Sequence, residues 1–595
     1  MPNLDVDRLI QGWRGPVIAA FVAMLAGLPG LIAVPPLDRD ESRFAEATAQ
    51  MLETGDYVNI RFQDMPRSKK PVGIHWLQAA AVSAVSDSEA REIWAYRLPS
   101  LLGAMLAAAA CAWGAAAFFG ARGGVIAGVT LATTFLLSTE AFIAKTDAML
   151  TACIVVAMGA LGRLYRDARG GPPAGRRIRL VFWLAMAGAV LIKGPIGPMV
   201  VAMTLLFLSI ADGKPLGLGK LARKLGLGPL LDRILAVTRP EPYDAPSPTR
   251  WIKSLGWVWG VLLVLIVVGP WAIAITVATD GSFWTDAIGG DLAPKLKGGH
   301  ERHGGPPGYH TLALPVMFFP GTLLLAAAAV AGWTRRMEPG VRFAVAWFIP
   351  SFILFELAPT KLPHYPLPVY AALAWLVAAA LERPLGTRAR WTGIGLAAFA
   401  AIALTAVNLY GMVQYGDADD VVWVSLTIGF ALVGVAVAAF FLLNRAGVTA
   451  LMIACVFGFL THGVMAAGVL PNLKPMWPSR SIAKTLKAKG MDPRNGVTPG
   501  PVELVGFSEP SAVFLLGTDT GLGGPIEGAQ AIAEHRPVFV EAKEEGKFRG
   551  ELAARGLRAV PVSVIRAYNY SRGKPLTLTL YRSATAGPGT RAAVR

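Results

Sequence analysis

Long apolar segments dominate this chain of 595 residues and limit what it can fold into. The runs 257–279 and 394–410, for example, contain no charged residue. A helix that crosses a bilayer needs about 20 predominantly apolar residues. Only 16% of the residues are charged, whereas about a quarter are charged in soluble proteins. The sequence therefore predicts a polytopic α-helical membrane protein.

The apolar segments predict about thirteen transmembrane helices. They lie near residues 16–34, 97–119, 123–140, 147–164, 179–196, 197–211, 255–278, 311–333, 341–358, 365–381, 391–412, 420–443 and 447–470. With an odd number of spans, the two termini lie on opposite sides of the membrane. The most basic loops, 163–179 and 214–253, then share one side, which the positive-inside rule makes cytoplasmic.

The opposite, outer face receives two long loops, 35–96 and 279–310, and the end of the chain. The first of these loops should carry short interfacial helices, because residues 41–52 have apolar side chains at helical spacing. Residues 471–595 are not membrane-like, and three stretches in them alternate as strands do. These stretches are 537–541, 560–570 and 576–582. We therefore expect a membrane domain over 1–470 and a small soluble α/β domain over 471–595.

The net charge of +17 does not indicate a nucleic-acid partner, because much of the Lys and Arg lies in short loops between apolar runs. The three cysteines, Cys111, Cys153 and Cys455, lie in apolar runs without paired spacing and are expected to be buried hydrophobic residues. No P-loop, dinucleotide-binding glycine pattern or HExxH motif stands in a usable context. An ATP-driven transporter is therefore disfavoured.

Acidic residues stand at the outer ends of two apolar segments. Asp40 and Glu41 follow the first span, where a carboxylate at a membrane face is costly unless it is solvated, paired or functional. The alternative is that Asp40 caps the helix that follows. Asp147 closes the short outer turn 140–147, which holds more charge than a tight turn needs; simple solvation of the loop is the alternative.

Basic residues on the same face could bind a phosphate. Lys70 precedes an aromatic run, and Lys193 interrupts an apolar one at a Gly/Pro-rich break. Arg302 lies in the Gly-rich loop, and Lys361 precedes His364 and Tyr365 in a proline-rich helix end. Interfacial anchoring to lipid headgroups is the alternative. The histidines beside Arg302 lack the spacing that would place both on one helix face for a metal.

In this order and at these membrane depths, the motifs resemble the ArnT and protein O-mannosyltransferase superfamily of lipid-dependent glycosyltransferases, which have the GT-C fold. The resemblance rests on Asp40-Glu41-Ser-Arg43-Phe-Ala-Glu46, Gly55-Asp56-Tyr57, Lys70-Pro71, Trp76-Leu77, Thr146-Asp147, Lys193-Gly194-Pro195, Pro270-Trp271 and Lys361-Leu-Pro-His-Tyr-Pro-Leu-Pro368. It covers most of the membrane part.

The resemblance implies an inverting enzyme of the bacterial inner membrane. The donor would be a sugar on a polyprenyl phosphate, most readily undecaprenyl phosphate, and the acceptor lipid A or another glycolipid on the periplasmic face. The implied catalytic residues are Asp40, Asp147 and Glu41. The implied contacts to the donor phosphate are Lys70, Arg302, Lys361, Lys193, Tyr365 and Arg43. No metal ligands are implied, and the need for a divalent cation stays open.

One departure concerns the sugar. The family pattern usually has Glu before the motif lysine, whereas this chain has Lys69. The extra positive charge argues against a cationic sugar such as aminoarabinose. A lipid or solute transporter, a protein glycosyltransferase or oligosaccharide ligase of the same fold, and a partner-binding scaffold remain as alternatives.

Overall fold

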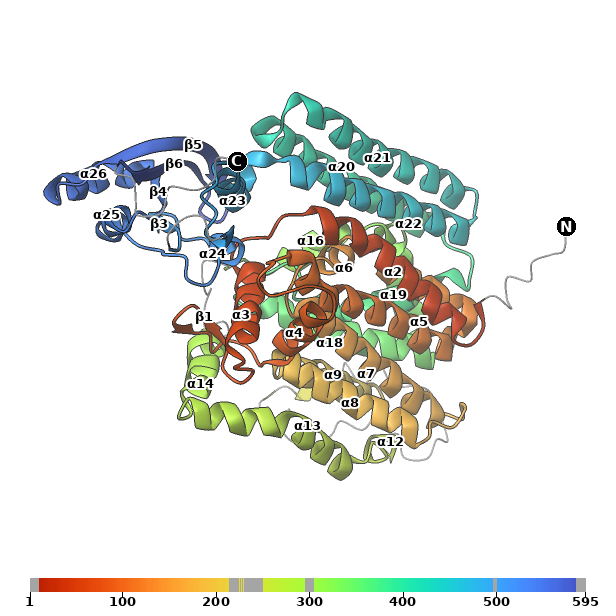
Figure 1. Ribbon diagram of the computed structural model, residues 1–595. Coiled ribbons are helices and arrows are strands. Elements are labelled where there is room, and N and C mark those ends of the chain that lie inside the picture. The colour runs from red at the N-terminus through yellow and green to blue at the C-terminus, as the bar shows by residue number, and fades with distance from the viewer. Residues whose placement is uncertain are drawn as a thin grey trace.

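Helices make up most of the protein, and a small sheet lies near its C-terminus (Figure 1). The computed structural model describes residues 10–212, 250–294, 304–495 and 500–584, with isolated positions 224, 226, 228 and 229. Its first half contains α2 (Arg14–Ala33), α3 (Asp40–Thr54), α4 (Gly73–Val85), α5 (Ile93–Ala132), α6 (Phe135–Glu140), α7 (Asp147–Asp167), α8 (Arg176–Lys193), α9 (Ile196–Ala211), α12 (Arg250–Lys253), α13 (Trp257–Ala278) and α14 (Ser282–Trp284). A short hairpin, β1 (Arg61–Phe62) and β2 (Met65–Pro66), lies between α3 and α4.

The second half of the membrane part begins after a π-helix, η1 (Thr285–Leu292). It contains α16 (Tyr309–Met317), α17 (Leu325–Thr334), α18 (Pro339–Leu357), α19 (Tyr370–Leu381), α20 (Thr387–Tyr415), α21 (Val421–Leu443) and α22 (Gly447–Val464). Eight helices in the described ranges are long and apolar enough to cross a membrane, or nine if the bent pair 309–317 and 321–334 is one span. The predicted membrane architecture is therefore confirmed, whereas the number thirteen stays a prediction.

Helix α5 shows why spans are hard to count. It runs for 40 residues but is two helices joined by a kink at Gly120, whose φ of 69° favours a residue without a Cβ. The kink separates the predicted spans 97–119 and 123–140. The second of these ends early, at Ala132, and α6 follows it as a separate short helix.

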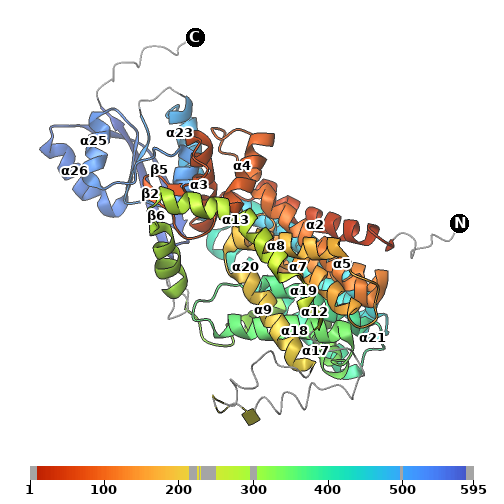
Figure 2. The same cartoon turned by 90° about the horizontal axis from the view of Figure 1, so that it is seen from below.

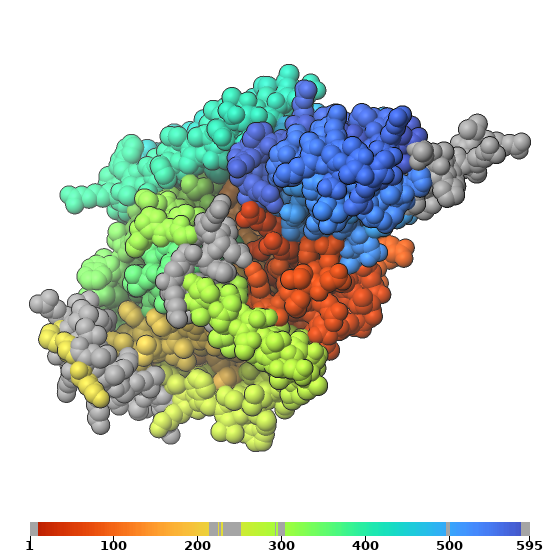
Figure 3. All heavy atoms as spheres, turned by 90° about the vertical axis from the view of Figure 1, so that its left-hand side faces the viewer, coloured from red at the N-terminus to blue at the C-terminus, as the bar shows by residue number. Residues whose placement is uncertain are grey.

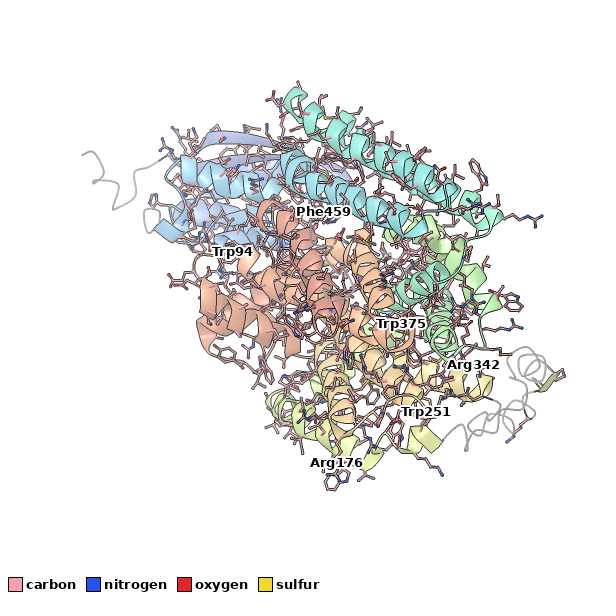
Figure 4. The ribbon with its side chains drawn as sticks, turned by 90° about the vertical axis from the view of Figure 1, so that its right-hand side faces the viewer. Trp94, Arg176, Trp251, Arg342, Trp375 and Phe459 are labelled. Carbon is pink, nitrogen blue, oxygen red and sulfur yellow. The ribbon has the colours of Figure 1, made fainter. Side chains whose placement is uncertain are left out.

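The core of the bundle lies around α5, which packs along α2, α7 and α19. Small residues permit this approach: a Cβ added at Gly103 would lie 2.6 Å from the backbone nitrogen of Met149 on α7. Trp347 and Trp375 are fully buried nearby and meet edge to face at 5.6 Å. Figure 4 shows Trp375 among the helices of the bundle.

The two ends of the bundle differ. Figure 4 places Arg176, Trp251 and Arg342 on the side of the bundle away from the C-terminal sheet, whereas Trp94 lies beside that part of the chain. Figure 2 shows α3 and α4 at the same end as the C-terminal elements. The long loop after α2 and the C-terminal part therefore meet at one end of the helices.

The C-terminal region, which we define as residues 478–584, consists of a four-stranded sheet with helices packed on both faces. Its helices are α23 (Pro478–Ala488), α24 (Pro510–Leu516), α25 (Pro525–Ala533) and α26 (Glu545–Ala554). Its strands β3 (Glu503–Val505), β4 (Val538–Glu541), β5 (Ala559–Asn569) and β6 (Lys574–Ser583) form a sheet in the order β3-β4-β6-β5. Only the pair β3–β4 is parallel.

Alternation along the strands builds two cores, one on each face of this sheet. Phe539 packs with residues of α23 and α24, whereas its neighbours Val538 and Val540 pack with residues of α25 and α26. The predicted strands correspond to β4, β5 and β6, whereas β3, which has only three residues, was not predicted. The predicted small sheet is therefore confirmed.

Candidate functional site

A cavity of about 490 Å³ lies where the start of α3, the turn before α7, the end of α8 and the C-terminal region meet. Figure 3 shows the C-terminal region lying against the N-terminal part of the chain that contains α3. The cavity is lined by Asp38, Arg39, Asp40, Arg43, Phe44, Arg67, Lys69, Lys70, Lys145, Thr146, Asp147, Lys193, Asp291, Thr360, Leu362, His364, Tyr365, Ser508, Glu509, Pro510 and Arg572. It therefore joins charged residues from distant parts of the sequence.

The backbone before α3 places Asp40 in the cavity. Pro35 and Pro36 follow α2 and cannot continue it. Arg39 then adopts a φ of 66°, an uncommon conformation for a residue other than glycine, and α3 begins at Asp40. Arg39 is the N-cap residue and no side chain caps the helix. The interpretation of Asp40 as a capping residue therefore has no support.

Asp40 is held as a carboxylate. Its side chain is 62% exposed within the cavity and lies 3.8 Å from the guanidinium of Arg67. The surrounding protein alone would raise the pKa of Asp40, but the positive charges of Arg67 and Lys145 outweigh this effect and lower the pKa. Arg67 in turn lies 5.0 Å over the ring of Phe44. Asp40 is therefore ionised and accessible.

The turn before α7 supplies a second carboxylate, Asp147. Its Oδ1 accepts a hydrogen bond from Lys193 Nζ at 2.6 Å, and Lys145 Nζ lies 3.7 Å from Oδ2. Lys145 also pairs with Glu140 at 3.0 Å. Burial alone would lower the pKa of Lys145, but Glu140 and Asp147 raise it, so the amine stays charged. These four residues form a nearly buried network of two acids and two amines.

His364 connects this network to the proline-rich segment. Its Nδ1 lies 3.2 Å from Lys145 Nζ, and its Nε2 lies 3.7 Å from Asp147 Oδ2. Burial lowers the pKa of His364 to about 3, so the imidazole is neutral near pH 7. Because Nδ1 accepts from the charged amine, the ring proton belongs on Nε2. The next residue, Tyr365, lies with its ring 5.8 Å from Lys193 Nζ.

Lys70 enters the cavity after the β1–β2 hairpin. Its Nζ donates to Asp291 at 2.7 Å, and Asp291 comes from the π-helix η1. A π-helix is uncommon and often marks a functional segment. Lys69 lines the cavity beside Lys70. The predicted phosphate contact Arg302 lies outside the described residues.

Two of the predicted site residues turn away from the cavity. Both carboxylate oxygens of Glu41 accept from Arg97 at 2.8 Å, and Glu41 also accepts from the backbone of Ala144. Lys361 donates to the carbonyl groups of Phe355 and Glu356. Neither side chain is among those that line the cavity. The structure therefore assigns Glu41 and Lys361 positions within the protein framework.

The contribution of the C-terminal region to the cavity was not predicted from the sequence. Ser508, Glu509, Pro510 and Arg572 line the cavity although they are more than 460 residues from Asp40 in sequence. No motif marks them, so their place depends on how the C-terminal region packs. Lys145 lies in the turn between Glu140 and Asp147. Its charge was the only feature of the sequence that could have indicated a role in the site.

The cavity favours an anionic ligand. Eight Lys or Arg residues line it against five Asp or Glu residues. Among the described residues, no group of three or more His, Cys, Asp or Glu is placed to hold a metal ion. An anion could therefore bind to lysine and arginine side chains while Asp40 stays available to a second reactant.

Sequence comparisons connect the chain to lipid-dependent sugar transferases. Residues 69–224 match the family described as dolichyl-phosphate-mannose-protein mannosyltransferase. The undecaprenyl phosphate-alpha-4-amino-4-deoxy-L-arabinose arabinosyl transferase of Edwardsiella ictaluri is 26% identical over 67% of this chain and 66% of that protein, slightly less than two thirds of its length. The protein of the same name from Pseudomonas paraeruginosa is 26% identical over 67% of this chain and 68% of its own length.

Structural comparison gives the fold. ArnT from Cupriavidus metallidurans, in a crystal structure bound to undecaprenyl phosphate, aligns with a TM-score of 0.68 at 20% identity, covering 96% of this chain and 99% of that one. Its apo structure aligns with a TM-score of 0.69. The likeness predicted from the sequence motifs is therefore confirmed at the level of fold.

Proposed function

We propose that this ArnT-like chain of the GT-C fold is an integral membrane glycosyltransferase that moves a sugar from a polyprenyl phosphate to an acceptor of the cell envelope. One observation carries the proposal: Asp40, Lys70 and Lys193 come from different elements but line one cavity at the end of the helices. A carboxylate beside an anion-binding cluster suits transfer of a sugar away from a phosphate.

In the proposed reaction the acceptor oxygen attacks the anomeric carbon of the sugar. The bond from that carbon to the phosphate oxygen breaks, and its electron pair leaves with the phosphate, which Lys70 and Lys193 stabilise as its negative charge grows. If the acceptor is a hydroxyl, Asp40 takes its proton. If the acceptor is an ionised phosphate, no proton is transferred and Asp40 orients it. Asp147 holds Lys193 in place at 2.6 Å.

The names of the relatives support undecaprenyl phosphate as the lipid of the donor. The sugar is a separate question, because Arg67, Lys69 and Lys145 add positive charge to the cavity. A neutral or acidic sugar avoids the repulsion that a cationic sugar would meet. We propose lipid A or another glycolipid as acceptor, the bacterial inner membrane as location, and a periplasmic position for residues 471–595 beside a membrane part over residues 1–470.

The test is sugar transfer in proteoliposomes that contain an undecaprenyl phosphate sugar and a lipid A acceptor. Asp40→Asn and Lys70→Ala should each lower the rate by at least about 100-fold. The matched control is Lys474→Ala, because Lys474 pairs with Asp417 at 2.7 Å, as Lys70 does with Asp291, but is 70% exposed and does not line the cavity. Activity in a chelator decides whether a divalent cation is needed.

Two results would contradict the proposal. Full activity of both Asp40→Asn and Lys70→Ala would show that the cavity is not the site of the reaction. Movement of intact donor lipid across the bilayer without transfer of its sugar would instead identify a transporter. Transfer to a protein rather than to a glycolipid would keep the fold and the cavity but change the acceptor.

A further inference from the structure

The C-terminal region forms the outer wall of the cavity through the turn between β5 and β6. The hydroxyl of Tyr570 accepts from the backbone nitrogen of Asp38 at 2.6 Å, and the carbonyl oxygen of Ser571 accepts from Arg39 Nη2 at 2.5 Å. Ser511 donates to the carboxylate of Asp38. The turn is therefore fixed against the two residues that directly precede Asp40.

A second set of contacts fixes the same region further along α3. Arg91 pairs with Glu46 and Glu53, and the hydroxyl of Thr518 lies within hydrogen-bond distance of both carboxylates, at 2.8 and 2.7 Å. Gln63, at the β1–β2 hairpin, donates to the carbonyl oxygens of Thr518 and Thr520. With two separate attachments, the C-terminal region has a defined position over the cavity.

This docking places Arg572 with part of its side chain accessible. Its Nη2 donates to Ser508 Oγ at 2.9 Å, and Glu509 lies 3.8 Å from its Nε, beyond hydrogen-bond distance. A guanidinium has five N–H donors, and 46% of this side chain is exposed. Its place in the cavity lining gives it access to a bound ligand.

The donor and the acceptor must both reach this cavity. The proposed function assigns the donor phosphate to Lys70, in the loop before α4, and to Lys193, at the end of α8. Arg572 and Ser508 belong to the wall that the C-terminal region contributes. We infer that Arg572 binds and orients an anionic group of the acceptor, such as a phosphate, so that the C-terminal region determines which acceptor the enzyme uses. This inference rests on the proposed function.

The experiment separates acceptor from donor kinetics in the reconstituted full chain, with lipid A and dephosphorylated lipid A as acceptors. Arg572→Ala should raise the acceptor KM roughly 10-fold to 100-fold, the range for losing a charge-assisted hydrogen bond. The donor KM should stay within about twofold, because Arg572 does not meet the donor phosphate. If dephosphorylated lipid A also accepts the sugar, wild type and variant should have the same KM for it; if it does not, the accepting oxygen belongs to the phosphate, and the acceptor KM for lipid A decides the inference.

Three further variants guard against a purely structural effect. Arg572→Lys keeps the charge and should recover part of the affinity. Ser508→Ala keeps Arg572 but removes the hydrogen bond that orients it, and should raise the acceptor KM less; it also serves if Arg572→Ala does not fold. The matched control is Arg549→Ala, because Arg549 also bonds a Glu and a hydroxyl in the C-terminal region but does not line the cavity.

The outcomes are distinguishable. If the wild-type protein transfers no sugar, the proposed function fails. If it transfers sugar but folded Arg572→Ala and Ser508→Ala keep the wild-type acceptor KM, only this inference fails. An equal rise in the donor KM of Arg572→Ala would also overturn the inference, because Arg572 would then act on the donor. The same rise in acceptor KM in Arg549→Ala would overturn it as well, because the effect would then be one of general stability.

Discussion

The guanidinium of Arg67 lies 3.8 Å from the carboxylate of Asp40. It is held there by the ring of Phe44, one turn of α3 further on, at 5.0 Å. Arg67 therefore contacts the face of an aromatic ring and an accessible carboxylate at the same time. It lowers the pKa of Asp40 in surroundings that would otherwise raise it.

Removal of Arg67 should change the pH dependence of transfer. In Arg67→Ala the pKa of Asp40 rises, because the largest opposing charge is lost. If the reaction needs the Asp40 carboxylate, the acidic limb of the profile of kcat/KM against pH should move to higher pH. The measurement is sugar transfer in proteoliposomes from about pH 3 to 8.

The conservative variant Arg67→Lys provides the control. It keeps a positive charge near Asp40 and should shift the acidic limb less than Arg67→Ala does. An unchanged acidic limb in the alanine variant would mean that another group controls activity at low pH.

Lys193 and Asp147 should depend on each other for stability. Both side chains are at least 86% buried, with exposures of 14% and 7%, and their charged atoms lie 2.6 Å apart. Lys193→Met leaves Asp147 without its nearest cation and should destabilise the protein by about 3 kcal/mol. Thermal unfolding in detergent measures this change.

The double variant tests the coupling. Lys193→Met with Asp147→Asn removes both charges, so it should be more stable than Lys193→Met alone but remain inactive. Strictly additive losses in the double variant would show that the two side chains do not stabilise each other.

Neighbouring residues show what the sequence could predict of the site. Asp40, Lys70, Asp147 and Lys193 were recognisable because each is a charge beside or within an apolar or aromatic run near a membrane face. Glu41 has the same signal but turns elsewhere, because consecutive residues of a helix point about 100° apart. The sequence shows that α3 begins near these residues but not which face of α3 lines the cavity.

Contacts between distant segments could not be predicted from the sequence. His364 meets Lys145 at 3.2 Å across 219 residues, and Arg572 reaches the cavity only because the turn between β5 and β6 lies against the residues before α3. No local pattern encodes such contacts. The strands themselves were predictable, because alternation of side chains is a local property.

The buried pair of Glu41 and Arg97 should matter for folding. Both side chains are fully buried, and Arg97 also donates to the carbonyl oxygens of Val34 and Pro35 at 2.6 and 3.0 Å. Arg97→Ala leaves a buried carboxylate and several carbonyl groups without their donor, and should destabilise the protein by about 3–5 kcal/mol. Glu41→Gln keeps an acceptor and should cost less.

Activity per folded molecule separates this role from catalysis. Glu41→Gln should retain transfer activity within about threefold once the folded fraction is measured by size-exclusion chromatography. A loss as large as that of Asp40→Asn would place Glu41 in the reaction instead.

Asp38 should make the stability of the protein depend on pH. Burial raises the pKa of Asp38 from 3.8 to about 7, although the hydrogen bond from Ser511 opposes the shift. Because the folded state holds the proton more tightly than the unfolded state, stability is greatest below about pH 4 for this group. It falls as the pH rises from about 4 to 7 and is constant above that.

Asp38→Asn removes this titration while keeping an acceptor for Ser511. The difference in melting temperature between Asp38→Asn and wild type should therefore shift in favour of the variant as the pH rises from 5 to 7.5. Other titrating groups contribute equally to both proteins and cancel in the difference. A difference that does not vary with pH would show that Asp38 has the same pKa in the folded and unfolded states.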